Sequence, residues 1–383
     1  MEISLADVAE HRVRRPQTYR HRSERRDYIM TRYRIGLPLL VACTFLSGWS
    51  TSARAETGAL NVLTWCDHED PALLEPFEKA HNVKVHYKDI DSTGAALAVI
   101  QQSHPGNWDV LVLDETDTGR LAEMGLLAAL DPAEFPMADL FEGVNDPALN
   151  VVKGKMYSVP EKFGYNAIAY DVAHIKASAL NDIQAPWSAE YKDRIAIYDY
   201  YVPIIAYAAQ ALGKDPEHLT DADLPALRDK LAALRHNAAL VGDITTTQQA
   251  LATGQVDILV GGGEWVTAGM HKDRPDLAYL VPAQGGIRWQ QGVAVFASSG
   301  HKDLATAFAR YILSPEAQGK LATSSCYWGM PANRKAILND ADKAILQWAQ
   351  QPAYIARTAT YPQLTPSFDK TLQKLWTEVM QNE

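Results

Sequence analysis

Leu60-Asn61-Val62-Leu63-Thr64-Trp65 decides the fold class of this chain, because a short apolar run of this kind is typical of a buried strand. A helical stretch opens at Pro71, and the alternating segment Val83-Lys84-Val85-His86-Tyr87 is predicted as a second strand. A further helix is predicted over 95–102 and a third strand over 108–113. Strands that alternate with helices favour an open, mostly parallel sheet with helices on both faces.

The same alternation restarts later in the chain. Strands are predicted over 166–170, 194–198 and 256–260, and a return strand over 287–296. Helices are predicted between them and over most of the C-terminal part. We therefore predict two α/β lobes joined by crossing strands, which is the geometry of a ligand clamp. The predicted first lobe comprises 56–163 with 287–335, and the predicted second lobe comprises 164–286 with 336–383.

The N-terminal segment differs in charge from the rest of the chain. Residues 1–55 contain ten Arg and five acidic residues, although the 383-residue chain has a net charge of −10. After Met30, a candidate for the true start, two Arg precede the apolar segment 35–49, and Ala53-Arg54-Ala55 follows as a small-x-small cleavage site. We predict a cleavable signal peptide over 1–55 and a periplasmic mature protein.

Composition and motifs exclude several classes of function. The acidic balance without a basic stripe argues against a nucleic-acid partner. Since no CxxC, HExxH, GxGxxG or GxSxG pattern occurs, the sequence predicts no metal site, no cofactor and no catalytic site. Lipid attachment at Cys43 is a less favoured alternative, because the apolar run continues past it. Whether the remaining cysteines, Cys66 and Cys326, are paired or free is left open.

Aromatic and acidic residues gather just past the predicted strand ends. Trp65 and Asp67 follow the first strand, Glu264 follows three Gly, and Trp289 lies in the return strand. A Trp face beside a carboxylate stabilises a desolvated organic cation, and the ring contributes roughly 0.5–2 kcal/mol. The alternative for Asp67 and Glu264 is a capping role at a helix N-terminus. A second alternative is a ferric-ion site made from Tyr200, Tyr201 and His68.

The order and spacing of several segments resemble the spermidine/putrescine-binding proteins of bacterial ABC transporters. This resemblance implies a type II periplasmic binding fold and an amine ligand held between aromatic rings and acids. The segments that carry it are Asn61-Val62-Leu63-Thr64-Trp65-Cys66-Asp67, Trp108-Asp109-Val110-Leu111-Val112, Tyr157-Ser158-Val159-Pro160, Gly285-Gly286-Ile287-Arg288-Trp289 and Tyr311-Ile312-Leu313-Ser314-Pro315.

The resemblance also implies roles for individual residues. Trp65 resembles the family's stacking Trp, Asp67 and Glu264 its amine-binding acids, and Trp289 a second ring of the cage. Gln291 stands where an acid is usual, so a ligand with one cationic head fits these residues as well as a polyamine does. Asp199 or Glu115 could supply the missing charge. The predicted ligand-binding residues are Trp65, Cys66, Asp67, His68, Glu115, Asp199, Tyr200, Glu264, Trp289, Gln291, Tyr327 and Trp328.

The sequence therefore predicts a monomeric solute-binding protein, not an enzyme, that delivers a small organic amine to an inner-membrane ABC permease. The expected mechanism is closure of the two lobes over the ligand. A ferric-ion or other non-amine solute remains an alternative with the same fold. A periplasmic enzyme that uses the same cleft is the less favoured alternative from another class.

Overall fold

The computed structural model describes residues 58–90 and 92–381. The predicted signal peptide over 1–55, with Met30 and Cys43, therefore lies outside the described residues. In the part of the chain that is described, no helix has the length and apolar character needed to cross a membrane.

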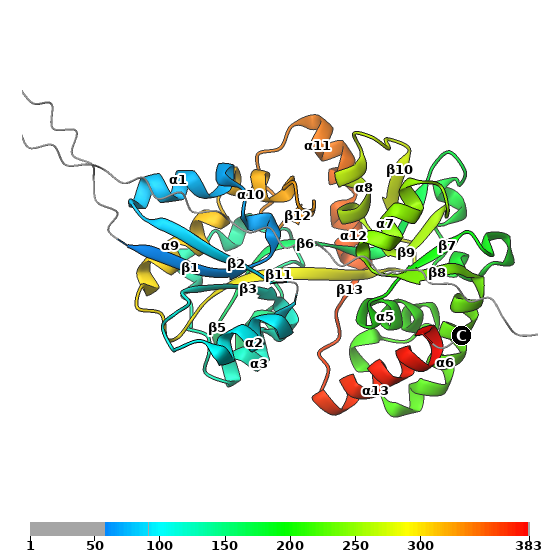
Figure 1. Ribbon diagram of the computed structural model, residues 1–383, viewed down its shortest axis with the longest axis horizontal. Coiled ribbons are helices and arrows are strands. Elements are labelled where there is room, and N and C mark those ends of the chain that lie inside the picture. The colour runs from blue at the N-terminus through cyan, green and yellow to red at the C-terminus, as the bar shows by residue number, and fades with distance from the viewer. Residues whose placement is uncertain (1–57, 91, 382–383) are drawn as a thin grey trace, which may run out of the picture. The chain divides into compact units, whose positions relative to one another are not determined.

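The first lobe is built around β1 (Ala59–Thr64), which runs parallel to β2 (Lys84–Asp89) on one side and to β3 (Val110–Asp114) on the other. The helix α1 (Pro71–His81) begins where the sequence predicts, because Asp70 accepts a hydrogen bond from the Ala72 amide at 2.8 Å. The predicted alternation of strands and helices is confirmed here (Figure 1). The other helices of this lobe are α2 (Thr93–Gln102), α3 (Thr118–Glu123), α9 (Lys302–Ile312) and α10 (Pro315–Ala322).

The second lobe repeats this plan around β7 (Ile195–Tyr198), which lies between the parallel strands β8 (Ala238–Gly242) and β9 (Ile258–Gly262). Gly261 and Gly262 continue β9 instead of forming a turn, and a side chain on Gly262 would overlap Ala169 on the adjacent strand. The other elements of this lobe are β10 (Leu277–Leu280), α5 (Tyr201–Ala211), α6 (Leu224–Asn237), α7 (Ile244–Ala252), α8 (Glu264–Met270) and α13 (Pro366–Trp376).

Two long strands, β6 (Val159–Asp171) and β11 (Ile287–Val295), join the lobes into one sheet of order β2-β1-β3-β11-β6-β9-β7-β8 (Figure 1). They are antiparallel to each other and buried along their whole length. β6 is longer than the predicted strand 166–170 because its first half pairs with β11. This arrangement confirms two α/β lobes joined by crossing strands.

Several short helices and strands connect the main elements described above. Trp348 and Tyr354, near the C-terminal end, pack into the same apolar core as Phe141 and Phe163. Leu372 and Trp376 of α13 lie instead in the apolar core of the second lobe. The lobe boundaries, including the assignment of 336–383 as a whole to the second lobe, remain predictions. The short elements are α4 (Pro147–Asn150), β4 (Val151–Val152), β5 (Lys155–Met156), β12 (Met330–Pro331), α11 (Asp340–Ile345), α12 (Gln351–Arg357) and β13 (Ala359–Thr360).

The crossing strands place a row of polar residues on one face of the sheet. Asp114 at the end of β3 is paired with Gln291 on β11, which is paired in turn with Lys162 on β6. Directly paired residues point to the same face, so these three side chains form a row across the three strands. Gly164 and Trp289 are paired two residues further along and therefore lie on the same face.

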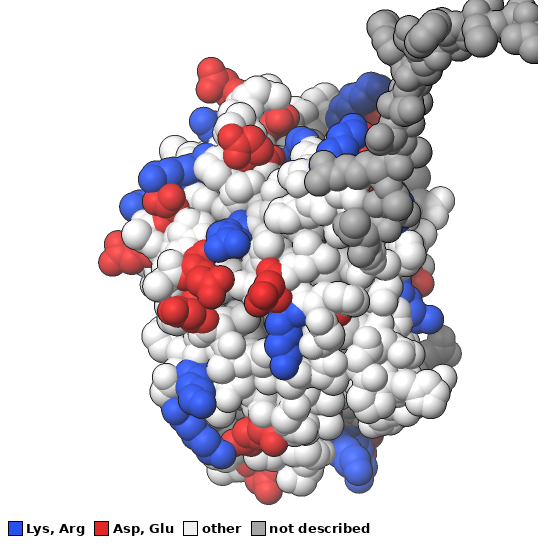
Figure 2. Space-filling view, turned by 90° about the vertical axis from the view of Figure 1, so that its left-hand side faces the viewer, with Lys and Arg blue, Asp and Glu red and all other residues white. Residues whose placement is uncertain are grey.

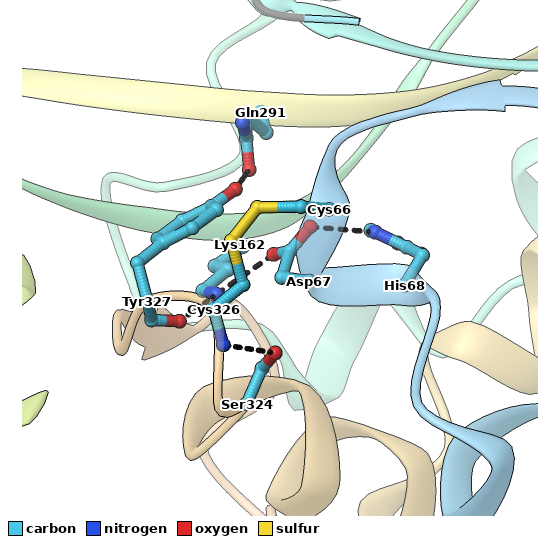
Figure 3. The surroundings of a disulfide bond; sticks show 8 residues. All are labelled: Cys66, Asp67, His68, Lys162, Gln291, Ser324, Cys326 and Tyr327. Carbon is cyan, nitrogen blue, oxygen red and sulfur yellow. Dashed lines mark hydrogen bonds and ion pairs between the residues drawn. A yellow bond between two sulfur atoms is a disulfide. The ribbon is translucent and has the colours of Figure 1, made fainter. Parts of the chain in front are cut away.

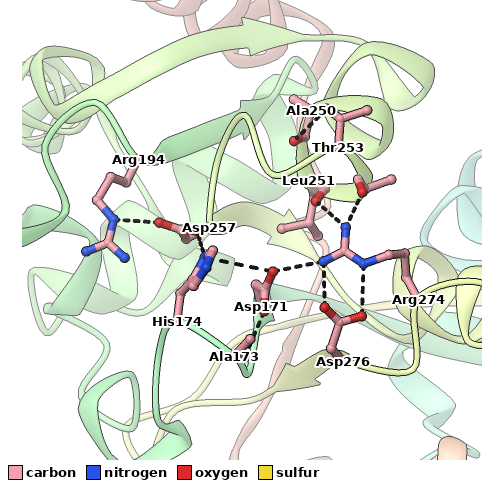
Figure 4. A network of polar contacts seen from close by, with 11 residues as sticks. Asp171, Ala173, His174, Arg194, Ala250, Leu251, Thr253, Asp257, Arg274 and Asp276 are labelled. Atoms are coloured by element: carbon pink, nitrogen blue, oxygen red, sulfur yellow. Dashed lines mark hydrogen bonds and ion pairs between the residues drawn. The ribbon is translucent and has the colours of Figure 1, made fainter.

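The far end of β6 carries a separate network of charges (Figure 4). Asp171 accepts a hydrogen bond from Arg274 at 2.8 Å, while Asp257 accepts one from Arg194 at 2.5 Å and contacts His174. The side chains of His174 and Arg194 are 54% and 38% exposed, so solvent screens this network.

The surface at the β1 end of the molecule carries charges of both signs. Figure 2 shows basic and acidic side chains interspersed over this face, without a field of one sign. The exposed ion pairs of the first lobe include Lys79 with Glu75 at 2.7 Å and Lys84 with Glu78 at 2.9 Å. Exposed pairs of this kind contribute little to stability, about 0–1 kcal/mol each.

Candidate functional site

The turn after β1 places Asp67 in a fully buried ion pair. Cys66–His68 form a single turn of 3-10 helix, and the Asp67 carboxylate accepts a hydrogen bond from the Lys162 ammonium at 2.8 Å (Figure 3). Both side chains have no solvent exposure. Burial alone would raise the pKa of Asp67, but the charges of Lys162 and His68 hold it well below its usual range. Asp67 is therefore ionised and already paired with a cation.

His68 completes a buried group of four charged residues, which we call the Asp67 quartet: Asp67, His68, Glu161 and Lys162. One ring nitrogen of His68 lies 2.9 Å from Asp67 and the other 3.2 Å from Glu161. Although burial opposes the charged form, these two carboxylates raise the pKa of His68 to about 10. The quartet therefore balances two negative charges with two positive ones.

Tyr327 covers the ammonium group of Lys162. The Lys162 nitrogen lies 3.9 Å from the centre of the Tyr327 ring and donates a hydrogen bond to the Tyr327 carbonyl oxygen at 3.1 Å. The Tyr327 hydroxyl donates to Gln291 at 2.9 Å (Figure 3). A carboxylate and an aromatic face on one ammonium form the environment that the sequence predicted for a ligand. Here the ammonium belongs to the protein.

A disulfide between Cys66 and Cys326 links the two segments that build this environment, and it answers the question that the sequence left open. The two Cα atoms lie 6.0 Å apart, and 260 positions separate the cysteines in the chain (Figure 3). Cys66 precedes Asp67 and Cys326 precedes Tyr327. The bond therefore fixes the distance between the carboxylate and the ring that enclose Lys162.

Trp289 and Glu264 meet above Gly164 on the same face of the sheet. A side chain on Gly164 would overlap both the Glu264 carboxylate and the Trp289 ring, which shows how closely the three residues pack. Glu264 accepts a hydrogen bond from the Tyr165 amide at 3.1 Å, and its other oxygen is buried without a partner among the described residues. Burial raises the pKa of Glu264 to about 8. The Trp289 ring is 9% exposed and lies edge-on to Tyr327 at 6.2 Å.

Between the lobes, Asp114 faces a cluster of tyrosines. Tyr198 and Tyr200 come from the second lobe, Tyr361 packs against the apolar core of that lobe, and the charge of Asp114 is near enough to contribute to a raised pKa in each. Their rings lie in edge-to-face contact, Tyr198 with Tyr200 and Tyr200 with Tyr361, each pair at 5.9 Å. Burial and the nearby charge of Asp117 raise the pKa of Asp114 to about 7. We call this group, Asp114 with the three tyrosines, the Asp114 cage.

Five residues of the site were not predicted from the sequence: Glu161 and Lys162 of the quartet, and Asp114, Tyr198 and Tyr361 of the cage. The signal for Lys162 was the pair of oppositely charged residues Glu161 and Lys162 shortly before the apolar residues of the predicted strand 166–170. The signal for Asp114 was its place at the end of a predicted strand, next to Glu115.

Glu115 and Asp199 accept hydrogen bonds from residues outside the cage, although the charge of Asp199 also contributes to the raised pKa of Tyr198. Glu115 is buried and accepts hydrogen bonds from Gln290 and Ser158. Burial raises the pKa of Glu115 to about 7, although these hydrogen bonds favour its ionised form and lower the pKa. Asp199 is exposed and accepts a hydrogen bond from the Trp376 indole at 2.6 Å.

The remaining predicted residues are divided between the site and its surroundings. Tyr200 belongs to the Asp114 cage, and Gln291 lies between the cage and the quartet. Trp328 packs against the core of the first lobe, so Tyr327 is the aromatic residue of this loop that faces the site. Trp65 is half-buried, and its indole nitrogen has no partner among the described residues.

The residues of the alternative ferric-ion site are engaged with other partners. Both nitrogens of His68 contact carboxylates of the quartet, whereas the Tyr201 hydroxyl donates to Asp369 in α13. Within the described ranges, no group of three or more His, Cys, Asp and Glu side chains has an arrangement that could hold a metal ion.

Comparisons with known proteins agree with this architecture. The curated relatives include the spermidine/putrescine-binding periplasmic protein 1 of Haemophilus influenzae, which is 23% identical over 75% of this chain and 80% of the relative. They also include the putrescine/agmatine-binding protein of Pseudomonas aeruginosa, which is 23% identical over 86% of this chain and 92% of the relative.

A solved structure shows the same fold. The substrate-binding protein of a spermidine/putrescine ABC transporter from Streptococcus pneumoniae superimposes with a TM-score of 0.72 at 19% identity, covering 85% of this chain and 99% of that protein. Residues 72–358 match the family model described as bacterial extracellular solute-binding protein. This chain therefore belongs to the bacterial extracellular solute-binding protein family.

Proposed function

We propose that this protein captures a small organic amine between its lobes and delivers it to an ABC permease of the inner membrane. The observation that carries the proposal is the Asp114 cage, in which a carboxylate at the end of β3 lies close to three tyrosines whose rings contact one another edge to face at 5.9 Å. A carboxylate and several ring faces together favour a desolvated ammonium group. The names of the two curated relatives, which refer to amines, support the same class of ligand.

The cage also supplies a mechanism for lobe closure. Asp114 ends β3 of the first lobe, whereas Tyr198 ends β7 and Tyr200 precedes α5 of the second. A cation held by Asp114 would contact the tyrosines only when the lobes are together. Binding therefore stabilises the closed state, and the two lobes in that state present the surface for the permease. This mechanism requires no covalent chemistry, so we infer a binding protein and not an enzyme.

Titration calorimetry of putrescine, choline and 4-aminobutyrate with the wild type and two variants tests the proposal. We expect saturable 1:1 binding of at least one amine without turnover, and a loss of about tenfold or more in Asp114→Asn. The matched control is Asp303→Asn, because Asp303 is exposed in the first turn of α9, away from the cage. Equal losses in the two variants, or consumption of the ligand, would contradict the proposal.

Export and oligomeric state belong to the same proposal. We infer that the chain is exported, that its signal peptide is cleaved after Ala55, and that the mature protein is a monomer. Mass spectrometry of the periplasmic protein tests the first two points, with an N-terminus at Glu56 as the expected result. Light scattering on the same sample tests the third.

A further inference from the structure

Lys162 occupies a position that has the features of an amine-binding subsite. Its ammonium group is fully buried, 2.8 Å from the Asp67 carboxylate, 3.1 Å from a carbonyl oxygen and 3.9 Å from the centre of an aromatic ring. These contacts combine an anion, a hydrogen-bond acceptor and a ring face, which together are what a buried ammonium requires. The protein therefore fills this subsite with its own side chain.

The surroundings leave no negative charge for a second ammonium at this place. Within the Asp67 quartet, the charges of Asp67 and Glu161 are balanced by Lys162 and His68. The nearest position on β11 is Gln291, an uncharged amide whose oxygen accepts the Tyr327 hydroxyl. Another cation placed here would meet two fixed positive charges, which is strongly unfavourable in a buried region. The nearby Glu264 carboxyl has one oxygen without a partner among the described residues, but burial raises its pKa to about 8 and so favours its neutral form.

Asp114 differs from Asp67 in this respect. Its carboxylate accepts no hydrogen bond from any side chain in the described ranges, and the titratable groups near it are tyrosines and Asp117. The row Asp114, Gln291 and Lys162 across the three strands thus has an acid at one end and a resident cation at the other.

We propose that Lys162 is a built-in substitute for one cationic end of a ligand, so that the protein selects a solute with a single cationic group. This inference rests on the proposed function and specifies its ligand class. The cationic group binds in the Asp114 cage, and the rest of the ligand extends along Gln291 toward Trp289 without a second charge. Lys162 acts here as a specificity-determining residue.

Calorimetry with n-butylamine and putrescine tests the inference, because the two differ only in the second ammonium group. For the wild type we expect putrescine to bind no more than about threefold more tightly than butylamine. In Lys162→Met, Asp67 and Glu161 lose a counter-charge, and putrescine should gain at least about tenfold relative to butylamine. The double variant Lys162→Met/Asp67→Asn is the matched control and should not show this gain.

The outcomes separate the inference from the proposed function. A wild type that binds putrescine tenfold or more tightly than butylamine overturns the inference and leaves the amine-binding function standing. If neither amine binds the wild type at millimolar concentration and no other amine does, the proposed function fails, and the inference fails with it. The ratio of the butylamine and putrescine dissociation constants of the wild type tests the inference even if Lys162→Met does not fold.

Chemical rescue gives a second, independent test. Lys162→Ala removes the atoms of one propylammonium ion, so n-propylammonium should restore the missing contacts with Asp67 and Tyr327. We expect this ion to raise the melting temperature of Lys162→Ala but not of the wild type or of Lys162→Ala/Asp67→Asn. An equal shift in all three forms would contradict the assignment of this subsite.

Discussion

Asp67 and Asp114 lie after neighbouring strands of the same lobe, yet their surroundings differ. Asp67 is held at 2.8 Å by Lys162 and at 2.9 Å by His68, and these two charges keep it ionised. Asp114 has tyrosines and Asp117 around it, and burial with the Asp117 charge raises its pKa to about 7. The same residue type thus serves two purposes. A carboxylate with a resident cation is a structural group, whereas one that faces only rings is available to a ligand.

The partly exposed charge network at the far end of β6 shows, by contrast, how burial increases the cost of losing one charged partner. Asp257 also contacts a histidine and a cationic side chain, but His174 and Arg194 are partly exposed (Figure 4). Water can solvate any member of that network that loses its partner. The Asp67 quartet has no such access, so the loss of one member leaves an uncompensated buried charge.

The largest expected effect on stability is that of Lys162→Met. It leaves Asp67 buried without its main counter-charge, and we expect a loss of about 3–5 kcal/mol in the free energy of unfolding, measured by urea titration. Arg194→Met is the control from the exposed network and should cost about 1 kcal/mol or less. Similar losses in both variants would show that burial does not distinguish the two clusters.

Reduction of the disulfide should have the next largest effect. The bond between Cys66 and Cys326 closes a long loop and holds Tyr327 over Lys162, so its loss should cost about 2–4 kcal/mol. Cys326→Ser should melt at the same temperature as the reduced wild type, and dithiothreitol should not lower it further. If dithiothreitol lowers the melting temperature of both proteins equally, the effect does not come from this bond.

Stability should fall with rising pH because of His68. Its pKa is near 6.5 in an unfolded chain and about 10 in the fold, so its stabilising contribution is complete below about pH 6.5. That contribution is lost progressively as the pH rises from there toward about 10, where the folded protein also releases the proton. His68→Gln should flatten the curve of melting temperature over this range. A variant curve parallel to that of the wild type would contradict the prediction.

The smallest expected effect concerns the pH dependence of amine binding. An ammonium prefers the ionised form of Asp114, whose pKa is about 7 without ligand, so affinity should rise by about tenfold at most between pH 6 and 8. Asp114→Asn should bind more weakly and lose this dependence, whereas Asp67→Asn should not lose it. Calorimetry at three pH values compares the variants, and a pH dependence that survives in Asp114→Asn would assign it to another group.

The position of a residue at a strand end could be predicted from the sequence, but its partner could not. Apolar runs and turns in the sequence locate the end of the first strand, which places Asp67, and the return strand, which places Trp289. Lys162 lies 95 positions from Asp67, and no local pattern shows that a lysine inside a strand will meet that particular acid.

The direction in which a side chain points at the end of a strand could not be predicted from the sequence either. Asp114 and Glu115 are adjacent at the end of β3, and the sequence analysis chose Glu115. The structure directs Glu115 toward Ser158 and Gln290, whereas Asp114 shares its face with Gln291 and Lys162. Because β3 ends at Asp114 and Glu115 begins a turn of 3-10 helix, the two adjacent side chains point in different directions, and a shift of one position exchanges the ligand-facing acid for an internal one.

The most direct test of the difference between the two aspartates is a crystal structure of the protein with n-butylamine at saturating concentration. We predict that the ligand nitrogen lies within hydrogen-bond distance of the Asp114 carboxylate, surrounded by Tyr198, Tyr200 and Tyr361, while Lys162 keeps its bond to Asp67. A ligand nitrogen bound to Asp67 with Lys162 displaced would contradict this prediction.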